Sequence, residues 1–154
     1  MKTLLNILLK IRRLYWRIVK PKTRGVRAIL VNSDGKILLV RHKYGTGWFL
    51  PGGKSRRNEA DEIALARELS EELGARDLQK MQKLGEYENK QEGKRDTIVV
   101  FMIHNFSLPR TEKKHFEIDQ IVFFDPASLP KETSPGTQRR IAEWRGEKTI
   151  DGRW

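Results

Sequence analysis

Three glutamates, Glu68, Glu71 and Glu72, stand three and four residues apart in a segment with no glycine or proline. On a helix they share one face, where like charges repel and where the C-terminal end of the helix dipole disfavours acids. A divalent cation would offset both costs, and hard carboxylate oxygens suit Mg²⁺ or Mn²⁺, which in turn suit phosphates. The spacing therefore predicts a metal site for a phosphate-bearing substrate. A solvated acidic helix face is the alternative interpretation of these three residues alone.

The surrounding segment has the composition of a helix, which we expect from Glu59 to Leu73. It contains six of the protein's 20 acids and one of its 31 basic residues. Asn58 is the expected N-cap, and Gly74 the expected stop. An apolar row beside the acidic face can pack on a sheet: Leu65, Leu69 and Leu73.

Short apolar runs on both sides of this helix predict strands. Two of them, residues 26–31 and 37–40, are joined by Asn-Ser-Asp-Gly, which indicates a β-hairpin. Further strands are expected at residues 83–88, 97–105 and 121–124, with a polar loop over 89–95 and a closing helix over 137–144. Strands around one central helix, with a second helix at the end, predict an α/β sandwich with a mixed sheet.

The spaced pattern from Gly53 to Ala75 resembles the Nudix box. Its fixed identities are all present: Gly53, Glu59, Arg67, Glu68, Glu71, Glu72 and Gly74. The preceding Trp-Phe-Leu-Pro-Gly-Gly also resembles the usual lead-in of that family, and Ala75 departs from it by being smaller than the preferred aliphatic residue. The resemblance covers roughly residues 24–146 and implies a Nudix-type α/β/α sandwich.

The resemblance also implies roles for the box residues. Glu68 and Glu72 would be the principal metal ligands, with Glu71 and the carbonyl of Gly53 completing the site around Mg²⁺ or Mn²⁺. Arg67 would orient the glutamates by ion pairing rather than contact the substrate. Glu59, near the other end of the helix, would be auxiliary.

The implied reaction is attack of water on a phosphorus of a pyrophosphate link, with the metal neutralising charge. Nucleoside triphosphates, ADP-ribose, nucleotide sugars, dinucleoside polyphosphates and 5′-triphosphorylated RNA are all substrates of enzymes with this box. The general base varies among relatives. A box glutamate is one candidate and an acid on a later loop is another, here Glu117 with Asp119 two residues on.

Several basic residues near the predicted site could hold phosphate oxygens. They are Arg41, Lys54, Arg56, Arg57 and Arg95. We expect Trp48 to pack in the core or a loop rather than stack on a base. The histidines, His42, His104 and His115, show no metal-ligand spacing.

The bulk composition limits the class of protein. A chain of 154 residues fits one domain, and the absence of cysteine excludes disulfides and thiolate chemistry and fits a cytoplasmic location. The net charge of +11 attracts phosphate ligands, nucleic acid or anionic lipid. A nucleotide- or RNA-binding module without catalysis is therefore the alternative to a hydrolase, but the box keeps all its carboxylates.

The first 22 residues lie outside the resemblance, and residues 23–154 are expected to form the hydrolase domain. Residues 1–20 read as a basic amphipathic helix without the features of a signal peptide. Its apolar face would dock on the domain or on a second subunit, as in a homodimer. The alternative is peripheral binding to an anionic membrane surface.

Overall fold

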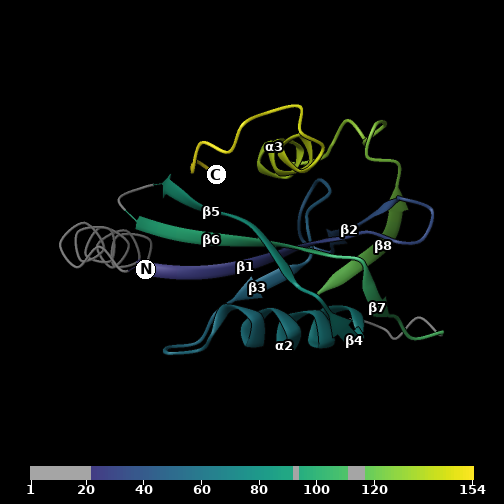
Figure 1. The fold of residues 1–154 in the computed structure, drawn as a ribbon, viewed down its shortest axis with the longest axis horizontal. Coiled ribbons are helices and arrows are strands. Elements are labelled where there is room, and N and C mark those ends of the chain that lie inside the picture. The colour runs from purple at the N-terminus through teal and green to yellow at the C-terminus, as the bar shows by residue number, and fades with distance from the viewer. Residues whose placement is uncertain (1–21, 92–93, 111–116) are drawn as a thin grey trace, which may run out of the picture.

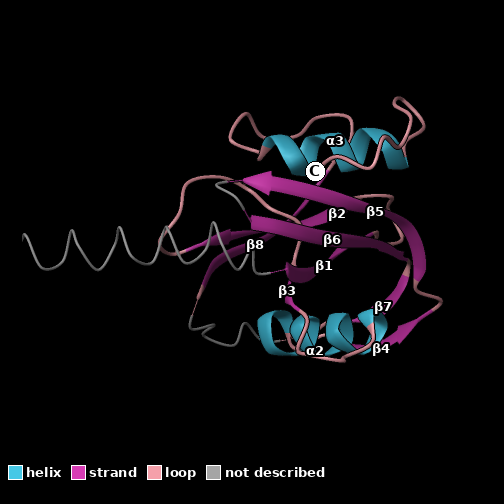
Figure 2. Cartoon of the chain, turned by 90° about the vertical axis from the view of Figure 1, so that its left-hand side faces the viewer, coloured by secondary structure: helices cyan, strands magenta, loops and turns pink. Residues whose placement is uncertain are grey.

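The structure is a computed structural model that describes residues 22–91, 94–110 and 117–154. The helix expected over residues 1–20 and His115 lie outside the described residues. Two helices enclose the strands, with α3 on one side and α2 on the other (Figures 1 and 2). The elements in chain order are β1 (Lys22–Leu30), β2 (Ile37–His42), β3 (Gly52–Lys54), α2 (Asp61–Leu73), β4 (Arg76–Gln79), β5 (Gln82–Gln91), β6 (Lys94–Ile103), β7 (Asn105–Ser107), β8 (Ile118–Phe124) and α3 (Pro135–Trp144).

The strands form one mixed sheet and two smaller ladders, which confirms the predicted α/β class. The four-stranded sheet has the order β3-β1-β6-β5, with β1 parallel to β6 and the other pairs antiparallel. Strand β2 pairs with β8, and β4 pairs with β7. In the part of the chain that the structure describes, no helix has the length and apolar composition to cross a membrane.

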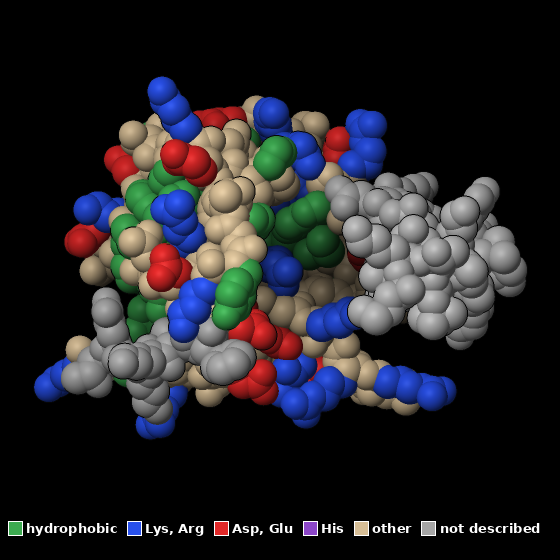
Figure 3. Space-filling model, turned by 180° about the vertical axis from the view of Figure 1, so that it is seen from behind, with side chains coloured by type: hydrophobic (Ala, Val, Ile, Leu, Met, Phe, Trp, Pro, Cys, Tyr) green, Lys and Arg blue, Asp and Glu red, His purple; other side chains and the backbone are tan. Residues whose placement is uncertain are grey.

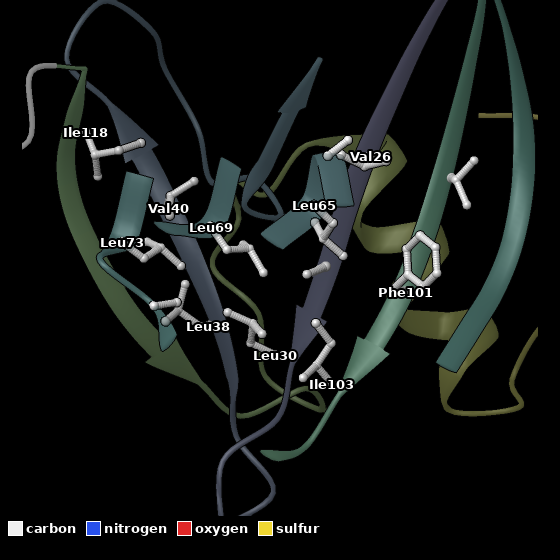
Figure 4. Close-up of a cluster of buried hydrophobic side chains, with 14 residues drawn as sticks. Val26, Leu30, Leu38, Val40, Leu65, Leu69, Leu73, Phe101, Ile103 and Ile118 are labelled. Atoms are coloured by element: carbon white, nitrogen blue, oxygen red, sulfur yellow. The ribbon is translucent and has the colours of Figure 1, made fainter. Parts of the chain in front are cut away.

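The two layers of core explain why β1 and β2 are apolar without alternation. Residues on one face of these strands, such as Val26 and Leu38, pack with α2, while Ile29 and Leu39 on the other face pack in a second cluster with Ile141 of α3. Strands buried on both faces read as continuous apolar runs. Figure 4 shows the cluster on the α2 side, including Leu65, Leu69 and Leu73 as expected.

The predicted hairpin is only partly correct. Its turn forms, because the side-chain oxygen of Asn32 accepts hydrogen bonds from the backbone N–H groups of Asp34 and Lys36. The two strands then pair only at the bridge between Val31 and Ile37 before β1 and β2 enter different ladders. Since both faces of each strand are buried, the apolar pattern does not specify the pairing partner.

Several boundaries differ from the sequence predictions, among them the start of α2 and the ends of β5 and β6 that face each other. Helix α2 begins at Asp61, and its N-cap is Ala60, not Asn58, which adopts a positive φ of 60°. Residues 56–59 form a turn instead, because the carboxylate of Glu59 accepts the backbone N–H of Arg56. The expected loop over residues 89–95 is wrong, since β5 and β6 continue their ladder to the pair Gln91 and Lys94.

The packing prediction for Trp48 is confirmed. Trp48 is buried and its ring meets Phe124 edge-on, with 4.8 Å between centroids. Ala75 is also buried, inside the core cluster beside α2. His42 lies near the ring of Phe49, and His104 is exposed.

Candidate active site

Helix α2 holds the glutamates at the edge of the four-stranded sheet, where β3 lies. Its leucines are buried against the strands, so the neighbouring face is directed towards the backbone of β3. The N–H groups of Gly74 and Ala75 bind the carbonyls of Ser70 and Leu69, and Gly74 adopts the left-handed conformation with φ of 65°. This stop, which the sequence predicts, ends the helix directly after the last glutamate.

The backbone of β3 touches the carboxylates of two of these glutamates. The carboxylate of Glu68 lies so close to Gly53 that a Cβ there would be 2.1 Å from its Oε2 atom. Only glycine allows this approach. The backbone N–H of Gly52 donates to Oε2 of Glu72 at 2.9 Å. These contacts place the carboxylates of Glu68 and Glu72 against the backbone of Gly52 and Gly53.

Arg67 holds two carboxylates at once, as predicted from the box. Its guanidinium donates two hydrogen bonds of 2.8 Å to Glu59 and one of 2.7 Å to Glu68, and a further one to the carbonyl of Lys54. Two hydrogen-bond partners lower the pKa of Glu59 to about 2: the Arg67 guanidinium, which binds it in a bidentate manner, and the backbone N–H of Arg56. Because Arg67 and Glu68 are mostly shielded from water, the pair fixes the carboxylate of Glu68 firmly.

Arg27 is a residue of the site that the sequence does not predict. Its guanidinium donates to the carbonyls of Val26 and Gly53, at 2.9 and 3.1 Å. Burial lowers its pKa, while the charges of Glu72 and Glu68 oppose that shift. One signal in the sequence could have indicated Arg27, which is its place between two apolar residues of a strand, Val26 and Ala28. Both of these neighbours are fully buried in the structure.

Glu72 lies where burial and like charges both disfavour its ionised form. Burial is the main cause that raises its pKa to about 7; the N–H of Gly52 and the charge of Arg27 oppose the shift, and the carboxylates of Glu68 and Glu117 add to it. Like charges thus converge on Glu72. A cation between them would relieve this repulsion.

Glu71 is the most exposed of the three glutamates. Its side chain is 57% exposed and lies 3.6 Å from Arg67 and 3.9 Å from Arg56. Among residues 22–91, 94–110 and 117–154, no group of three acidic or histidine side chains is gathered closely enough to hold a metal ion. The structure therefore brings together Glu68, Glu72 and Gly53, and leaves Glu71 at the rim.

Glu117 comes close enough to act on the charge of Glu72, although it is 45 residues away in the sequence. Its backbone carbonyl accepts the N–H of Lys43, which ties the start of β8 to the end of β2. Asp119, two residues on, is exposed. Of the two late acids, Glu117 is the one beside the site.

The predicted phosphate-binding cations are spread over three places. Lys54 and Arg56 flank the Arg67 network, and Arg57 is exposed in the same loop. Arg41 lies on β2, with its guanidinium 5.9 Å from the ring of Trp48. Arg95 is exposed at the start of β6, where it pairs with Lys22 of β1. Lys22 lies four residues before the position of β1 that pairs with Gly53.

A cavity of about 470 Å³ opens beside Arg27, on the side of the sheet that α3 covers. It has an apolar part and a polar part, formed by Phe49, Leu50, Ile98, Pro135 and Trp154, and by Asn89, Asp96, Ser134, Thr137 and Arg139. Figure 3 shows a hollow at mid-height, with hydrophobic side chains inside it and basic and acidic side chains near its rim. Arg27 is shared by this cavity and the glutamate site, so the two are adjacent.

Comparisons with known proteins agree on the kind of domain. A family model described as the NUDIX domain matches residues 21–145. The crystal structure of a MutT NUDIX hydrolase from Burkholderia pseudomallei superimposes with a TM-score of 0.70 at 29% identity, over 80% of this chain and 98% of that one.

Two curated relatives match over shorter stretches. An RNA pyrophosphohydrolase of Hydrogenovibrio crunogenus is 41% identical over 50 residues, 32% of this chain and 30% of the relative. A putative 8-oxo-dGTP diphosphatase of Bacillus subtilis is 42% identical over 52 residues, 34% of this chain and 35% of the relative. The matched stretch thus spans about a third of the length of the curated relatives.

Proposed function

Because the chain belongs to the Nudix family, we propose that it hydrolyses a pyrophosphate bond in a nucleoside-diphosphate-linked substrate, using a divalent cation. The observation that carries this proposal is the meeting of Glu68 and Glu72 at the backbone of Gly52 and Gly53, beside a cavity that shares Arg27. The carboxylates suit a cation, and the cavity suits the organic part of a nucleotide.

The donor set fits Mg²⁺ or Mn²⁺. Glu68 and Glu72 offer hard oxygen donors, and the repulsion around Glu72 is what a cation would relieve. Glu71, on the exposed rim, would complete the set from the solvent side. A bound cation would neutralise charge on the phosphates and lower the pKa of the attacking water.

The residues around the glutamates would hold the metal ligands in position and bind the phosphates of the substrate. Arg67 and Glu59 hold Glu68 in place before any ligand arrives, which reduces the reorganisation needed on binding. Arg27 presents a guanidinium between the glutamates and the cavity and would contact a phosphate oxygen there. Arg41, Lys54, Arg56, Arg57 and Arg95 would add attraction for phosphates at the rim.

A carboxylate would accept the proton of the attacking water. The candidates are Glu72, within the site, and Glu117, whose charge contributes to the raised pKa of Glu72. We favour Glu117 as the base, because Glu72 is needed as a cation ligand. A Glu117→Gln variant should then lose turnover while its affinity for Mn²⁺ stays close to that of the wild type.

The names of the relatives narrow the substrates to test first. One is named for RNA and the other for 8-oxo-dGTP, so capped or triphosphorylated RNA 5′ ends and nucleoside triphosphates come before ADP-ribose and nucleotide sugars. The test is a panel of these compounds with excess Mg²⁺ or with EDTA, and the products are identified by mass spectrometry. Metal-dependent release of a nucleoside monophosphate or an RNA 5′-monophosphate supports the proposal. Tight binding without turnover of any compound, with Mn²⁺ also tried, would favour the binding module.

A further inference from the structure

The segment that follows α3 returns to the edge of the four-stranded sheet. The backbone N–H of Glu88 in β5 donates to the carbonyl of Gly152 at 2.8 Å, and the N–H of Trp154 donates to the carbonyl of Glu88 at 3.1 Å. These bonds add residues 152–154 beside β5 in parallel. Figure 1 shows the yellow segment leaving α3 and ending next to β5.

A buried charged cluster attaches the same segment to α3. Arg140 is fully buried and donates to the carbonyl of Arg153 and to Glu143, both at 2.8 Å. Glu143 also accepts the hydroxyl of Tyr87 in β5 at 2.7 Å, and the Arg140 guanidinium lies 3.8 Å from the centroid of the Tyr87 ring. A buried ion pair with this many partners is costly to break, so the position of residue 153 is well fixed.

The indole of Trp154 therefore has a defined position on the first turn of α3. A Cβ at Gly136 would lie 2.7 Å from its Nε1 atom, so the ring rests directly on that glycine. The ring also meets Tyr87 edge-on, with 6.1 Å between centroids, and lies 5.4 Å from the Arg140 guanidinium. It is only partly buried and forms a wall of the cavity that contains Arg27.

We propose that Trp154 is a substrate-binding residue that stacks on the base of the substrate. The inference rests on the proposed function, in which the phosphates of the substrate bind at the glutamates and Arg27. The base of the substrate then lies in the cavity. An aromatic ring offers every base a stacking surface, and Asn89 and Asp96 in the same cavity offer donors and acceptors to the base edge. The pairing with β5 and the Arg140 cluster hold the ring in place before binding.

The test compares Trp154→Ala, Trp154→Phe and Gly136→Ala with the control Trp144→Ala. Trp144 packs against the same core cluster but does not line this cavity. Gly136→Ala keeps the indole and displaces it, and it remains informative if Trp154→Ala folds poorly. Each variant is first checked for its thermal midpoint. The assays then give kcat and KM for ATP, GTP, CTP and UTP, inhibition by inorganic pyrophosphate, and binding of the four nucleoside monophosphates by calorimetry.

Loss of a stacking ring should weaken nucleotide binding by about 5- to 100-fold. For Trp154→Ala and Gly136→Ala we expect KM and the nucleotide dissociation constants to rise by this amount. We expect kcat to stay within about twofold and pyrophosphate inhibition to be unchanged, because pyrophosphate has no base. Trp154→Phe should recover most of the affinity. Changes in Trp154→Ala no larger than those in Trp144→Ala would overturn the inference. If the wild type shows no turnover but Trp154→Ala still binds the nucleoside monophosphates more weakly, the inference about Trp154 stands and the proposed hydrolase activity is contradicted.

Discussion

At the scale of single residues, the site is built from side chains held against backbone. Glu68 fills the space that a side chain at position 53 would need, and Glu72 binds the N–H of Gly52. Arg67 fixes the other side of Glu68 and links it to Glu59. The backbone of Gly53 and the Arg67 guanidinium thus set the position of the Glu68 carboxylate. The N–H of Gly52 sets the position of the Glu72 carboxylate.

The first prediction concerns this contact at Gly53. In Gly53→Ala the new methyl would overlap the carboxylate of Glu68, so we expect turnover to fall at least about 10-fold and stability to fall by about 1–3 kcal/mol. Urea unfolding and steady-state assays measure both. In a Glu68→Ala background the same substitution should cost little stability. Equal costs in the two backgrounds would show that the contact is unimportant.

The second prediction concerns the raised pKa of Glu72. Its folded pKa of about 7 lies above its ordinary value of 4.5, so the folded protein binds more protons than the unfolded one between these values. The free energy of unfolding of the metal-free protein should therefore fall as pH rises from about 4.5 to 7. Glu72→Gln keeps an acceptor for Gly52 but cannot ionise, so at pH 8 in EDTA it should be more stable than the wild type, by on the order of 1–3 kcal/mol.

Urea unfolding at several pH values gives the comparison directly. The two proteins should be similar at about pH 4.5, since Glu72 is then protonated in the folded state. Mg²⁺ should restore the stability of the wild type at pH 8 but not raise that of Glu72→Gln. Parallel stability profiles across this pH range would contradict the assignment.

The sequence predicted most of the residues that meet at the site, but not all. Glu68, Glu72, Gly53 and Arg67 could be named because their spacing resembles a known pattern. Arg27 could not, because its place depends on β1 pairing with β3, 26 residues further along the chain. The exposure of Glu71 was also unpredictable, since it depends on side-chain partners rather than on helical spacing.

At the scale of elements, α2 is the part that positions the chemistry. One face of it is apolar and buried, and the other carries the carboxylates, so packing the leucines also aims the glutamates. Arg24 fixes its N-terminus by a bidentate pair with Asp61 at 2.7 Å, and also contacts Glu86 of β5. The helix is thus attached to the sheet at the end opposite its glycine stop.

The third prediction concerns that stop. Gly74 has a left-handed φ of 65°, and a Cβ there would lie 3.1 Å from Pro109. Gly74→Ala should lower the free energy of unfolding by about 1–2 kcal/mol. Gly45→Ala is the control, because a Cβ there meets nothing within 4 Å and its φ is not positive. Chemical denaturation distinguishes them, and equal stability of the two variants would contradict the role of Gly74.

Helices were easier to predict than strand partners. The glycine stop after α2 is a local signal, and both helices end at the expected residues. Strand β3 contains Gly-Gly-Lys and has no strand propensity of its own, so only its pairing with β1 makes it a strand. The separation of β1 and β2 into different ladders was likewise invisible in their apolar runs.

At the scale of the whole molecule, the two helix layers carry different parts of the proposed site. The α2 side carries the glutamates, and the α3 side carries the adjoining cavity, with Arg27 reaching between them. The net charge of +11 surrounds this arrangement with a field that attracts phosphates. Basic residues at the rim, such as Lys54 and Arg57, are exposed and do not need to contact the substrate to contribute.

The fourth prediction follows from this field. Raising the salt concentration from about 0.05 to 0.5 M should lower kcat/KM several-fold while kcat changes little, since screening weakens the approach of a charged substrate. A Lys54→Gln/Arg57→Gln double variant should depend less on salt than Lys148→Gln, an exposed position after α3. Steady-state kinetics at matched free Mg²⁺ would show this. A kcat/KM that does not change with salt would contradict it.

The most direct test is the rate of hydrolysis of the best panel substrate as a function of free Mg²⁺, for the wild type, Glu68→Gln and Glu62→Gln. Glu62 is an exposed acid at the start of the same helix and controls for loss of charge. The account predicts metal-dependent turnover in the wild type and Glu62→Gln, and a loss of at least about 100-fold in Glu68→Gln. Equal turnover in Glu68→Gln and the wild type, or turnover that persists in EDTA, would contradict a cation site built on α2.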